Sequence, residues 1–275
     1  MSDRGIKRAL SSSDMRWRER YGPWAAVTGA TSGIGRAVAE DLARRGLDLV
    51  IAARRGELLD SLAQELNGRF GTETRTLAGD LALDETNDRL FAETLPLDVG
   101  LFVASAGFGT SGPLHRAQPD AELAMVDLNI RAVLKQTHHF AKRFAEQRRG
   151  GLVLLSSIVA WQGVPRASNY AATKAYVQSL AEALSHELGP LGVDVLASAP
   201  AQVASGFGAR ADMRMTGADP VPIARNTLDA LGRRTLVIPH GKGKFLTAAL
   251  APLPRPLRVR VMATVMKGMT KHQPA

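Results

Sequence analysis

The sequence predicts an α/β fold in which helices cover both faces of a parallel sheet. The first indication is that short apolar segments alternate with segments of helical periodicity from Trp24 onward. The second is a glycine-rich turn, Thr28–Gly35 (TGATSGIG), which joins the first apolar segment to the first helical one. The third is that small or polar residues follow several predicted strands, at Gly29, Ser105, Ser157 and Pro200. Ligands bind at the carboxyl ends of strands in such sheets, so the pattern is that of a doubly wound, Rossmann-type domain.

The expected strands and helices alternate along the chain. The strands are short apolar runs and cover residues 24–27, 47–52, 74–78, 99–104, 152–156 and 192–199. The helices have apolar residues spaced three and four apart, beginning near Ile34 and continuing over residues 57–67, 85–95, 120–147 and 169–188. Strands separated by helical stretches indicate a parallel sheet, because each helix returns the chain to the same edge.

We expect a single catalytic domain over residues 23–240, because the sequence contains no repeat, linker or low-complexity block. Residues 1–22 are polar and mixed in charge, which predicts a poorly ordered or loosely docked N-terminal arm. Residues 241–275 form a basic tail that ends in an amphipathic helix. One face of that helix carries Leu257, Val261, Val265 and Met269, and another carries Arg260, Thr264, Lys267 and Lys271. The tail could dock on the domain or on a second subunit, or it could contact an anionic membrane surface.

Charge and composition exclude several classes of protein. The formal net charge is +9, but residues 205–275 alone hold twelve Lys and Arg against three Asp and Glu, and the body of the chain is slightly acidic. A nucleic-acid-binding domain is therefore not indicated. The sequence has no cysteine, no apolar run that could cross a bilayer and no secretory signal, in keeping with a cytoplasmic protein. His138 and His139 are adjacent and diverge on a helix, so we expect no metal site.

The glycine-rich turn has the properties of a phosphate-binding loop. Gly29, Gly33 and Gly35 allow unusual backbone angles and let a phosphate approach the main chain without a Cβ in the way. The N–H groups and the positive dipole end of the following helix would receive a pyrophosphate. The glycine spacing is G-x-x-x-G-x-G rather than G-x-G-x-x-G, and such a turn alone is weak evidence of binding.

Four residues in the second half of the domain point to acid–base chemistry. Tyr170 and Lys174 (YAATK) lie four residues apart in a predicted helix and so share one face. A tyrosine with an ordinary pKa of about 10 is a poor acid–base catalyst near neutrality, but a neighbouring cation favours the phenolate and lowers that pKa. Ser157 follows the fifth strand and can point at the same space. Asn129 lies within the long helix, where asparagine is a mediocre helix former. Taken alone, the Tyr170–Lys174 pair could be a surface pair and Asn129 a surface polar residue.

Together these residues resemble the short-chain dehydrogenase/reductase family, in its compact single-domain branch. The match runs in order through TGATSGIG, Asp80, Ser105-Ala106-Gly107, Asn129, Ser157, Tyr170, Lys174 and Pro200, and covers about Trp24–Ser205. The resemblance implies that Tyr170 is the acid for carbonyl reduction and the base for alcohol oxidation. It implies that Lys174 holds the nicotinamide ribose and tunes Tyr170, that Ser157 binds the reacting oxygen, and that Asn129 positions a relay water. The implied cofactor-binding residues are Gly29, Thr31, Ser32, Gly33, Ile34, Gly35, Arg54, Arg55, Asp80, Leu81, Ser105, Ala106, Gly107, Tyr170, Lys174, Pro200, Val203 and Ser205.

The end of the second strand indicates NADP(H) rather than NAD(H). An NAD enzyme places Asp or Glu there to bind the ribose diol, whereas this chain has Ala52-Ala53-Arg54-Arg55. Arg54 or Arg55 could form charge-assisted bonds to a 2′-phosphate, although the two could also be a solvated loop pair. In the family pattern Asp80 contacts the adenine edge. The chain departs from that pattern at Ser105, usually Asn, and at Ala201, usually Gly, which puts the local sheet support and the shape of the nicotinamide pocket in doubt.

The substrate side is less specified by sequence. Phe108, Trp161, Phe207 and Met213 lie in or beside loops that the resemblance places around the pocket, and core packing is an equal interpretation. Gly206–Pro220 is the expected lid, or else a flexible loop whose arginines meet water. The entry segment Arg20–Ala25 (RYGPWA) and the basic tail resemble ketoacyl- and hydroxysteroid-type reductases. The sequence thus predicts a homo-oligomeric oxidoreductase for an apolar carbonyl or alcohol, with a non-catalytic NADP(H) sensor as the alternative.

Overall fold

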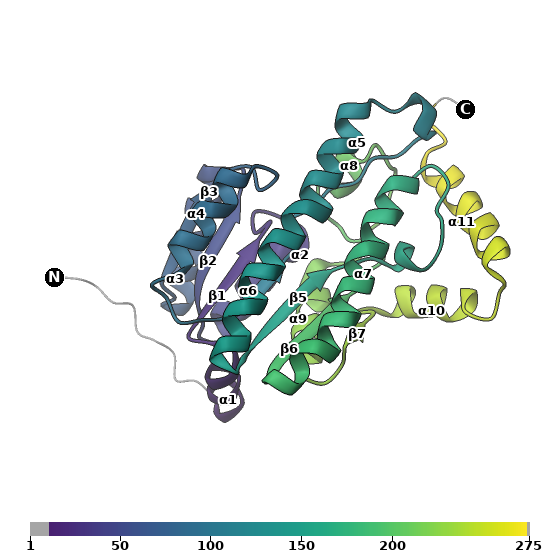
Figure 1. Ribbon diagram of the computed structural model, residues 1–275. Coiled ribbons are helices and arrows are strands. Elements are labelled where there is room, and N and C mark those ends of the chain that lie inside the picture. Colours follow the sequence, from purple (N-terminus) through teal and green to yellow (C-terminus); the bar gives the residue numbers. More distant parts are fainter. Residues whose placement is uncertain (1–10, 274–275) are drawn as a thin grey trace.

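A seven-stranded parallel sheet forms the centre of the molecule, with strand order β3-β2-β1-β4-β5-β6-β7 (Figure 1). The computed structural model describes residues 11–273. The strand bounds are β1 Trp24–Thr28, β2 Asp48–Ala53, β3 Thr74–Ala78, β4 Val99–Ala104, β5 Gly150–Leu155, β6 Val193–Ser198 and β7 Leu236–Val237. The order reverses between β1 and β4, and this reversal is where a doubly wound sheet opens a crevice for a ligand.

The central strands are apolar throughout because helices cover the sheet on both sides. Every residue of β1, β2, β4 and β5 is buried, as the continuous Val, Leu, Ile and Ala runs indicate for a parallel sheet. Alternate side chains then join two different cores: Val27 and Ile51 belong to one, and Ala26 and Val50 to the other. The predicted doubly wound fold is confirmed.

Each core takes its own set of helices. On one face of the sheet pack α2 Gly33–Arg44, α3 Gly56–Phe70 and α9 Pro220–Ala230. On the other face pack α4 Asp84–Thr94, α6 Val133–Gln147 and α7 Ser168–Leu188. The connections also contain single turns, at η1 Leu114–Arg116, η3 Ile158–Trp161 and η4 Gly189–Leu191. The seventh strand was not predicted, because two residues are too few to carry a periodic signal.

The long helix predicted over residues 120–147 has three parts. An α-helix, α5 Pro119–Val126, passes into a π-helical turn, η2 Asp127–Ala132, and then into α6. A π turn widens the helix locally and is frequent at functional sites. Here the turn contains Asn129, which is 1% exposed and faces the interior.

The N-terminal segment differs from the loosely docked arm expected over residues 1–22. Residues 12–21 form α1 Ser12–Tyr21, capped by the Ser11 side chain, which accepts a hydrogen bond from the Asp14 N–H. Tyr21 is 2% exposed and Trp17 packs against the same core, four residues before it. The sequence did not predict the helix because its charged residues outnumber the two apolar residues, Trp17 and Tyr21, that face the core. Residues 1–10 of the expected arm lie outside the described residues.

The C-terminal tail forms two helices, α10 Gly241–Leu250 and α11 Arg255–Met269, beside the carboxyl edge of the sheet (Figure 1). Helix α11 packs on the domain through Met262 and Met266, against the loop before α7 and the lid segment. The predicted apolar face is thus wrong in part: Leu257 is 41% exposed and Val261 is 37% exposed. Met262 and Met266, one position further round the helix, are buried, while Val265 and Met269 of the predicted face are half-buried. No helix within residues 11–273 is long and apolar enough to span a membrane.

Candidate active site

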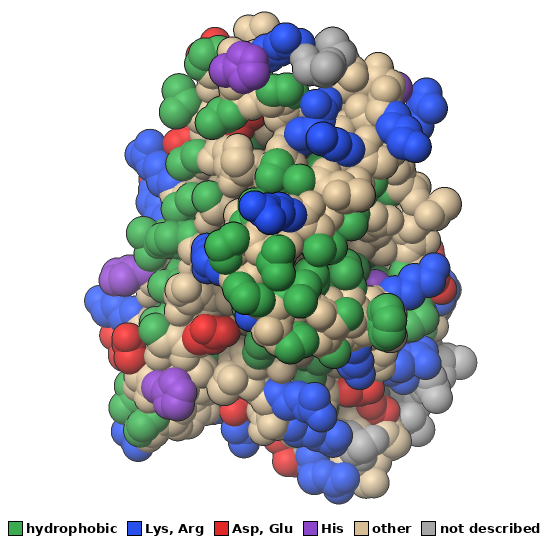
Figure 2. Space-filling view, turned by 90° about the vertical axis from the view of Figure 1, so that its right-hand side faces the viewer, with side chains coloured by type: hydrophobic (Ala, Val, Ile, Leu, Met, Phe, Trp, Pro, Cys, Tyr) green, Lys and Arg blue, Asp and Glu red, His purple; other side chains and the backbone are tan. Residues whose placement is uncertain are grey.

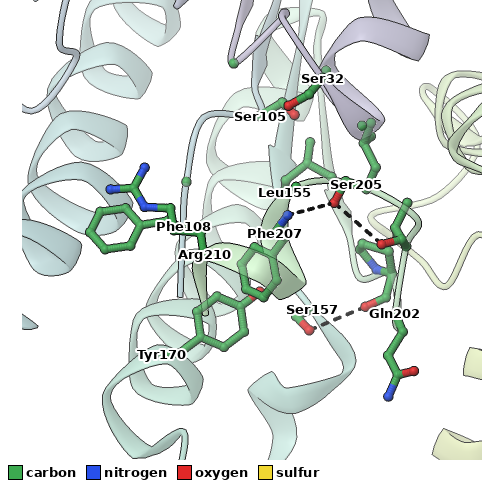
Figure 3. Close-up of a pocket in the computed structure, with 18 of the residues that line it drawn as sticks. Ser32, Ser105, Phe108, Leu155, Ser157, Tyr170, Gln202, Ser205, Phe207 and Arg210 are labelled. Atoms are coloured by element: carbon green, nitrogen blue, oxygen red, sulfur yellow. Dashed lines mark hydrogen bonds between the residues drawn. The ribbon is translucent and has the colours of Figure 1, made fainter. Parts of the chain in front are cut away.

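The carboxyl ends of β1 to β6 surround a cavity of about 480 Å³ (Figure 3). This volume is within the range of small-molecule and cofactor sites. Every residue that the sequence analysis assigned to the cofactor lines the cavity except Lys174, which lies behind Tyr170. Ser157 and Tyr170 also line it, while Asn129 is buried behind the β4 loop. The lid helix α8 Phe207–Arg210 covers one side.

At its glycines, the glycine-rich turn is packed too closely for a side chain. Gly29 has φ +72°, and a Cβ there would lie 2.8 Å from the Ala106 Cα atom. A Cβ at Gly35 would collide with the Gly29 carbonyl, so the start of α2 lies directly on the turn. Glycine is therefore required for the close approach of three backbone segments, and it leaves the first N–H groups of α2 facing the cavity.

The end of β4 is held by the hydroxyl of Thr28. This oxygen accepts hydrogen bonds from the Ser105 N–H at 3.1 Å and the Ala106 N–H at 3.2 Å. It also donates to the Val103 carbonyl at 3.4 Å. The sheet support that Ser105 put in doubt is thus supplied by the main chain and Thr28.

Arginines collect at the end of the cavity next to β2. Arg54 and Arg55 are exposed at its rim, and Arg55 Nη2 donates to the Thr31 hydroxyl at 2.9 Å. Arg210 reaches the same cavity from the lid, with its guanidinium 3.7 Å from the Phe108 ring centroid. Burial and then repulsion from Arg54 lower the pKa of Arg210, while Asp80 opposes the shift. This end of the cavity therefore has an excess of positive charge, with three arginines against Asp80.

Arg210 was not among the residues that the sequence assigned to the cofactor. From the sequence, it belongs either to the expected lid, Gly206–Pro220, or to a flexible loop whose arginines meet water. Only the fold shows that α8 turns this side chain toward the Phe108 ring (Figure 3). The charge of Arg54 also acts on it there. No spacing rule in the sequence carries that information.

Tyr170 faces the cavity from the first turn of α7. Its ring lies 5.2 Å from the Phe207 ring, between centroids, and the two side chains lie together in Figure 3. Burial raises the pKa of Tyr170, and a hydrogen bond with Ser157 acts in the opposite direction. Ser157 Oγ also lies 3.4 Å from the Pro200 carbonyl, to which it donates. Tyr170 is therefore protonated near neutrality and able to act as an acid.

The net shift of the Tyr170 pKa is upward, because burial has the largest effect on it, whereas the sequence predicts that Lys174 lowers this pKa. The Lys174 ammonium donates to the Leu155 carbonyl at 2.7 Å and lies 5.8 Å from the Tyr170 ring centroid. Lys174 is 8% exposed, and burial lowers its own pKa to about 8. Burial has the largest effect on both pKa values and favours the neutral form of each group. Lys174 has no neighbouring carboxylate that would favour its charged form.

Asn129 joins the β4 loop to α7. Its amide donates to the Phe108 carbonyl at 2.8 Å and to the Thr173 hydroxyl at 3.2 Å. Its carbonyl accepts from the Phe108 N–H at 3.1 Å. A Cβ at Gly107 would lie 3.0 Å from Asn129 Oδ1 and 3.7 Å from Lys174 Nζ, so these groups meet behind the cavity.

A family model described as short chain dehydrogenase matches residues 23–214. The chain belongs to the short-chain dehydrogenase family. A 7beta-hydroxysteroid dehydrogenase of Clostridium sardiniense is 36% identical over 182 residues, which are 66% of this chain and 70% of that protein. A structure from a study of 7beta-hydroxysteroid dehydrogenase stereoselectivity has a TM-score of 0.83 at 27% identity, over 89% of this chain and 98% of that one. A short-chain dehydrogenase from Sphingobium yanoikuyae in complex with NADPH has a TM-score of 0.76 at 28% identity, over 84% and 94% of the two chains.

This short-chain dehydrogenase is an oxidoreductase that uses a nicotinamide cofactor. The residues present fit such a cofactor, because glycines at positions 29, 33 and 35 leave the main chain of the turn open where its pyrophosphate would lie. Gly29 to Gly35 would hold that group, and the arginines after β2 would lie at its adenosine end.

The remaining wall of the short-chain dehydrogenase cavity is apolar. Phe108, Phe207 and Met213, three of the suggested substrate residues, line it. Trp161 does not, since it lies at a smaller neighbouring cavity of about 130 Å³ beside α10. Further apolar residues of the lid and tail line the cavity although the sequence did not assign them to the site. They are Met215, Leu246, Met262, Val265, Met266 and Met269. The amphipathic pattern of the tail indicated a docked helix but not that its inner side would form a pocket wall.

Proposed function

We propose that this enzyme reduces a bulky, apolar ketone with NADPH, and oxidises the corresponding secondary alcohol in reverse. The observation that carries the proposal is the division of the cavity. Tyr170 and Ser157 stand at its centre, arginines stand at one end, and methionines from the lid and α11 form the apolar wall.

The proposed roles of the residues follow from their positions. The chemistry that a bound reduced nicotinamide would supply is a hydride for the carbonyl carbon. Tyr170, which its raised pKa keeps protonated, donates its proton to the carbonyl oxygen. Ser157 donates a hydrogen bond to the same oxygen and stabilises the charge that develops there. Lys174, as its ammonium form, stabilises the phenolate that Tyr170 becomes and holds the nicotinamide ribose. Asn129 fixes the Phe108 loop and supports a water that returns a proton to the site.

NADP(H) preference is supported by charge. The end of β2 carries no carboxylate that would bind a ribose diol, and Arg54 and Arg55 stand there instead. Arg210 adds a third cation from the lid. A 2′-phosphate would bring the compensating negative charge, and guanidinium groups bind phosphate oxygens through paired hydrogen bonds.

The class of substrate is supported by the shape and lining of the apolar wall. Methionine side chains adapt to irregular apolar surfaces, so several of them suit a large rigid or lipid-like molecule. The relative from Clostridium sardiniense is named for a hydroxysteroid, which is such a molecule. The alternative of an NADP(H) sensor without turnover is not favoured, because pure binding needs no buried phenol held by a serine.

The test is a panel of ketones graded by apolar size, each assayed with NADPH and with NADH. We expect kcat/KM to rise with substrate size and to be at least about tenfold higher with NADPH, the equivalent of one charge-assisted hydrogen bond. Turnover confined to small, polar carbonyls would contradict the proposed substrate. The homo-oligomer implied by the family resemblance belongs to the same proposal, and the mass of the purified enzyme in solution tests it.

A further inference from the structure

The outer surface of α10 and α11 carries exposed apolar side chains. Phe245 on α10 is 77% exposed, and Leu257 and Val261 on α11 are 41% and 37% exposed. Prolines 252, 254 and 256 and several alanines are exposed between them. Figure 2 shows hydrophobic side chains gathered in the middle of this side of the molecule. We call this surface, which residues 242–271 supply, the outer C-terminal face.

Cations surround the apolar residues of this face. Six are exposed, namely Lys242, Lys244, Arg255, Arg260, Lys267 and Lys271. Residues 241–275 contain no Asp or Glu. None of the six forms an ion pair with a residue in the range 11–273. On α11, Arg260 and Lys267 lie along one side of the stripe of Leu257 and Val261, with Thr264 between the two rows, and Lys271 follows the end of the helix.

We propose that the outer C-terminal face binds the surface of an anionic lipid membrane. An apolar stripe bordered by Lys and Arg is the composition that lies at the headgroup boundary, with the aromatic and aliphatic side chains inserted and the cations against lipid phosphates. From the sequence, docking of the tail on protein and its contact with a membrane are alternatives for one face of the helix. In the structure they belong to opposite faces: Met262 and Met266 dock inward, and Leu257 and Val261 remain outside.

A second copy of this chain fits the face less well. A two-fold interface here would place the same basic surface on both sides, so that unpaired cations would oppose cations. An anionic lipid surface instead supplies the opposite charge over the whole area, and each Lys or Arg near it contributes about fivefold in affinity.

The experiment is flotation of the full chain with vesicles of phosphatidylcholine alone and of phosphatidylcholine with phosphatidylglycerol, without substrate or cofactor. We expect binding to the anionic vesicles only, weakening as salt rises. Phe245→Ser combined with Leu257→Ser, and separately Lys267→Glu with Lys271→Glu, should each lower the partition coefficient by more than about tenfold. Leu95→Ser, at a side chain that is 72% exposed on another part of the surface, and Lys142→Glu are the matched controls and should leave it unchanged.

Absence of binding to anionic vesicles by the folded wild-type chain would overturn the proposal. So would equal losses in the control variants, or a change from dimer to monomer on Phe245→Ser, which would assign the face to a second copy. Ketone reduction in solution is measured in parallel on every variant. Since none of the altered residues lines the cavity, unchanged turnover shows that the fold is intact and keeps this test separate from that of the proposed activity.

Discussion

Tyr170 and Lys174 lie one helical turn apart on α7, yet burial moves their pKa values in opposite directions. Burial raises the pKa of Tyr170 and lowers that of Lys174 to about 8. In both cases the neutral form is favoured, because neither group has a buried counter-charge. The pair is thus arranged so that the tyrosine holds its proton and the lysine can lose its own.

The first prediction at the residue scale concerns pH. Reduction needs protonated Tyr170, which is present at all pH values below its raised pKa. The Lys174 ammonium, which stabilises the phenolate left on Tyr170 after proton transfer, is lost as pH rises through about 8. We therefore expect kcat/KM for ketone reduction to be level from about pH 6 to about pH 7.5 and to fall above about pH 8. Lys174→Met should lower the rate and remove this fall, and a fall that persists unchanged in that variant would contradict the assignment.

The second residue-scale prediction concerns cofactor choice. Arg54→Glu places a carboxylate where a 2′-phosphate would lie, so kcat/KM with NADPH should drop at least about tenfold while that with NADH changes little. Lys142→Glu, on the exposed side of α6, is the charge-matched control and should alter neither value. A preference for NADPH that survives Arg54→Glu would show that Arg54 does not bind the phosphate.

At the scale of elements, the inner side of α11 both packs on the domain and lines the cavity. Met266 is 4% exposed and joins the small core with Val164 and Ala171, and it also lines the cavity. The neighbouring main chain ties the helix to the lid, since the Arg214 N–H donates to the Met269 carbonyl at 3.0 Å. Removal of this wall should therefore change both stability and substrate binding.

The prediction for α11 is that Met266→Ala lowers the free energy of unfolding by about 2–4 kcal/mol. The same change should raise KM for bulky ketones more than for small ones, because only a large substrate reaches the apolar surface that this methionine provides. Val261→Ala, on the outer side of the same helix, should cost less than about 0.5 kcal/mol. Chemical denaturation and a comparison of KM across the ketone panel measure the two effects. Equal effects on small and large substrates would remove α11 from the substrate wall.

The elements also show which sequence signals were sufficient. Continuous apolar runs predicted the strands of the central sheet to within about two residues, since such runs bury on both faces wherever they pair. The π turn around Asn129 and the two-residue strand β7 have no periodic signature. Helix α1 was missed because its apolar stripe, Trp17 and Tyr21, is narrow and its other residues are charged.

At the scale of the whole molecule, the order of motifs along the chain predicted the fold and the residues that line the cofactor side of the cavity. What it could not supply were distances between segments remote in sequence. The 5.8 Å from the Lys174 ammonium to the Tyr170 ring, the turn of Arg210 toward the β2 end, and the displacement of Trp161 from the cavity all depend on tertiary packing. Met262 and Met266 of α11, which line the cavity, lie about one residue further round the helix than the apolar face predicted from the sequence.

In the whole molecule, one cavity joins the glycine-rich turn, a buried acid and an apolar wall. The most direct measurement is a titration of NADPH into wild-type enzyme and Tyr170→Phe, followed by assay of both with a bulky ketone. We expect NADPH to bind the two proteins with similar affinity. Turnover should be at least about a hundredfold lower in Tyr170→Phe, which is the lower bound for loss of a general acid. Turnover by Tyr170→Phe equal to that of wild type, or failure of the wild-type enzyme to bind NADPH, would contradict the proposed function.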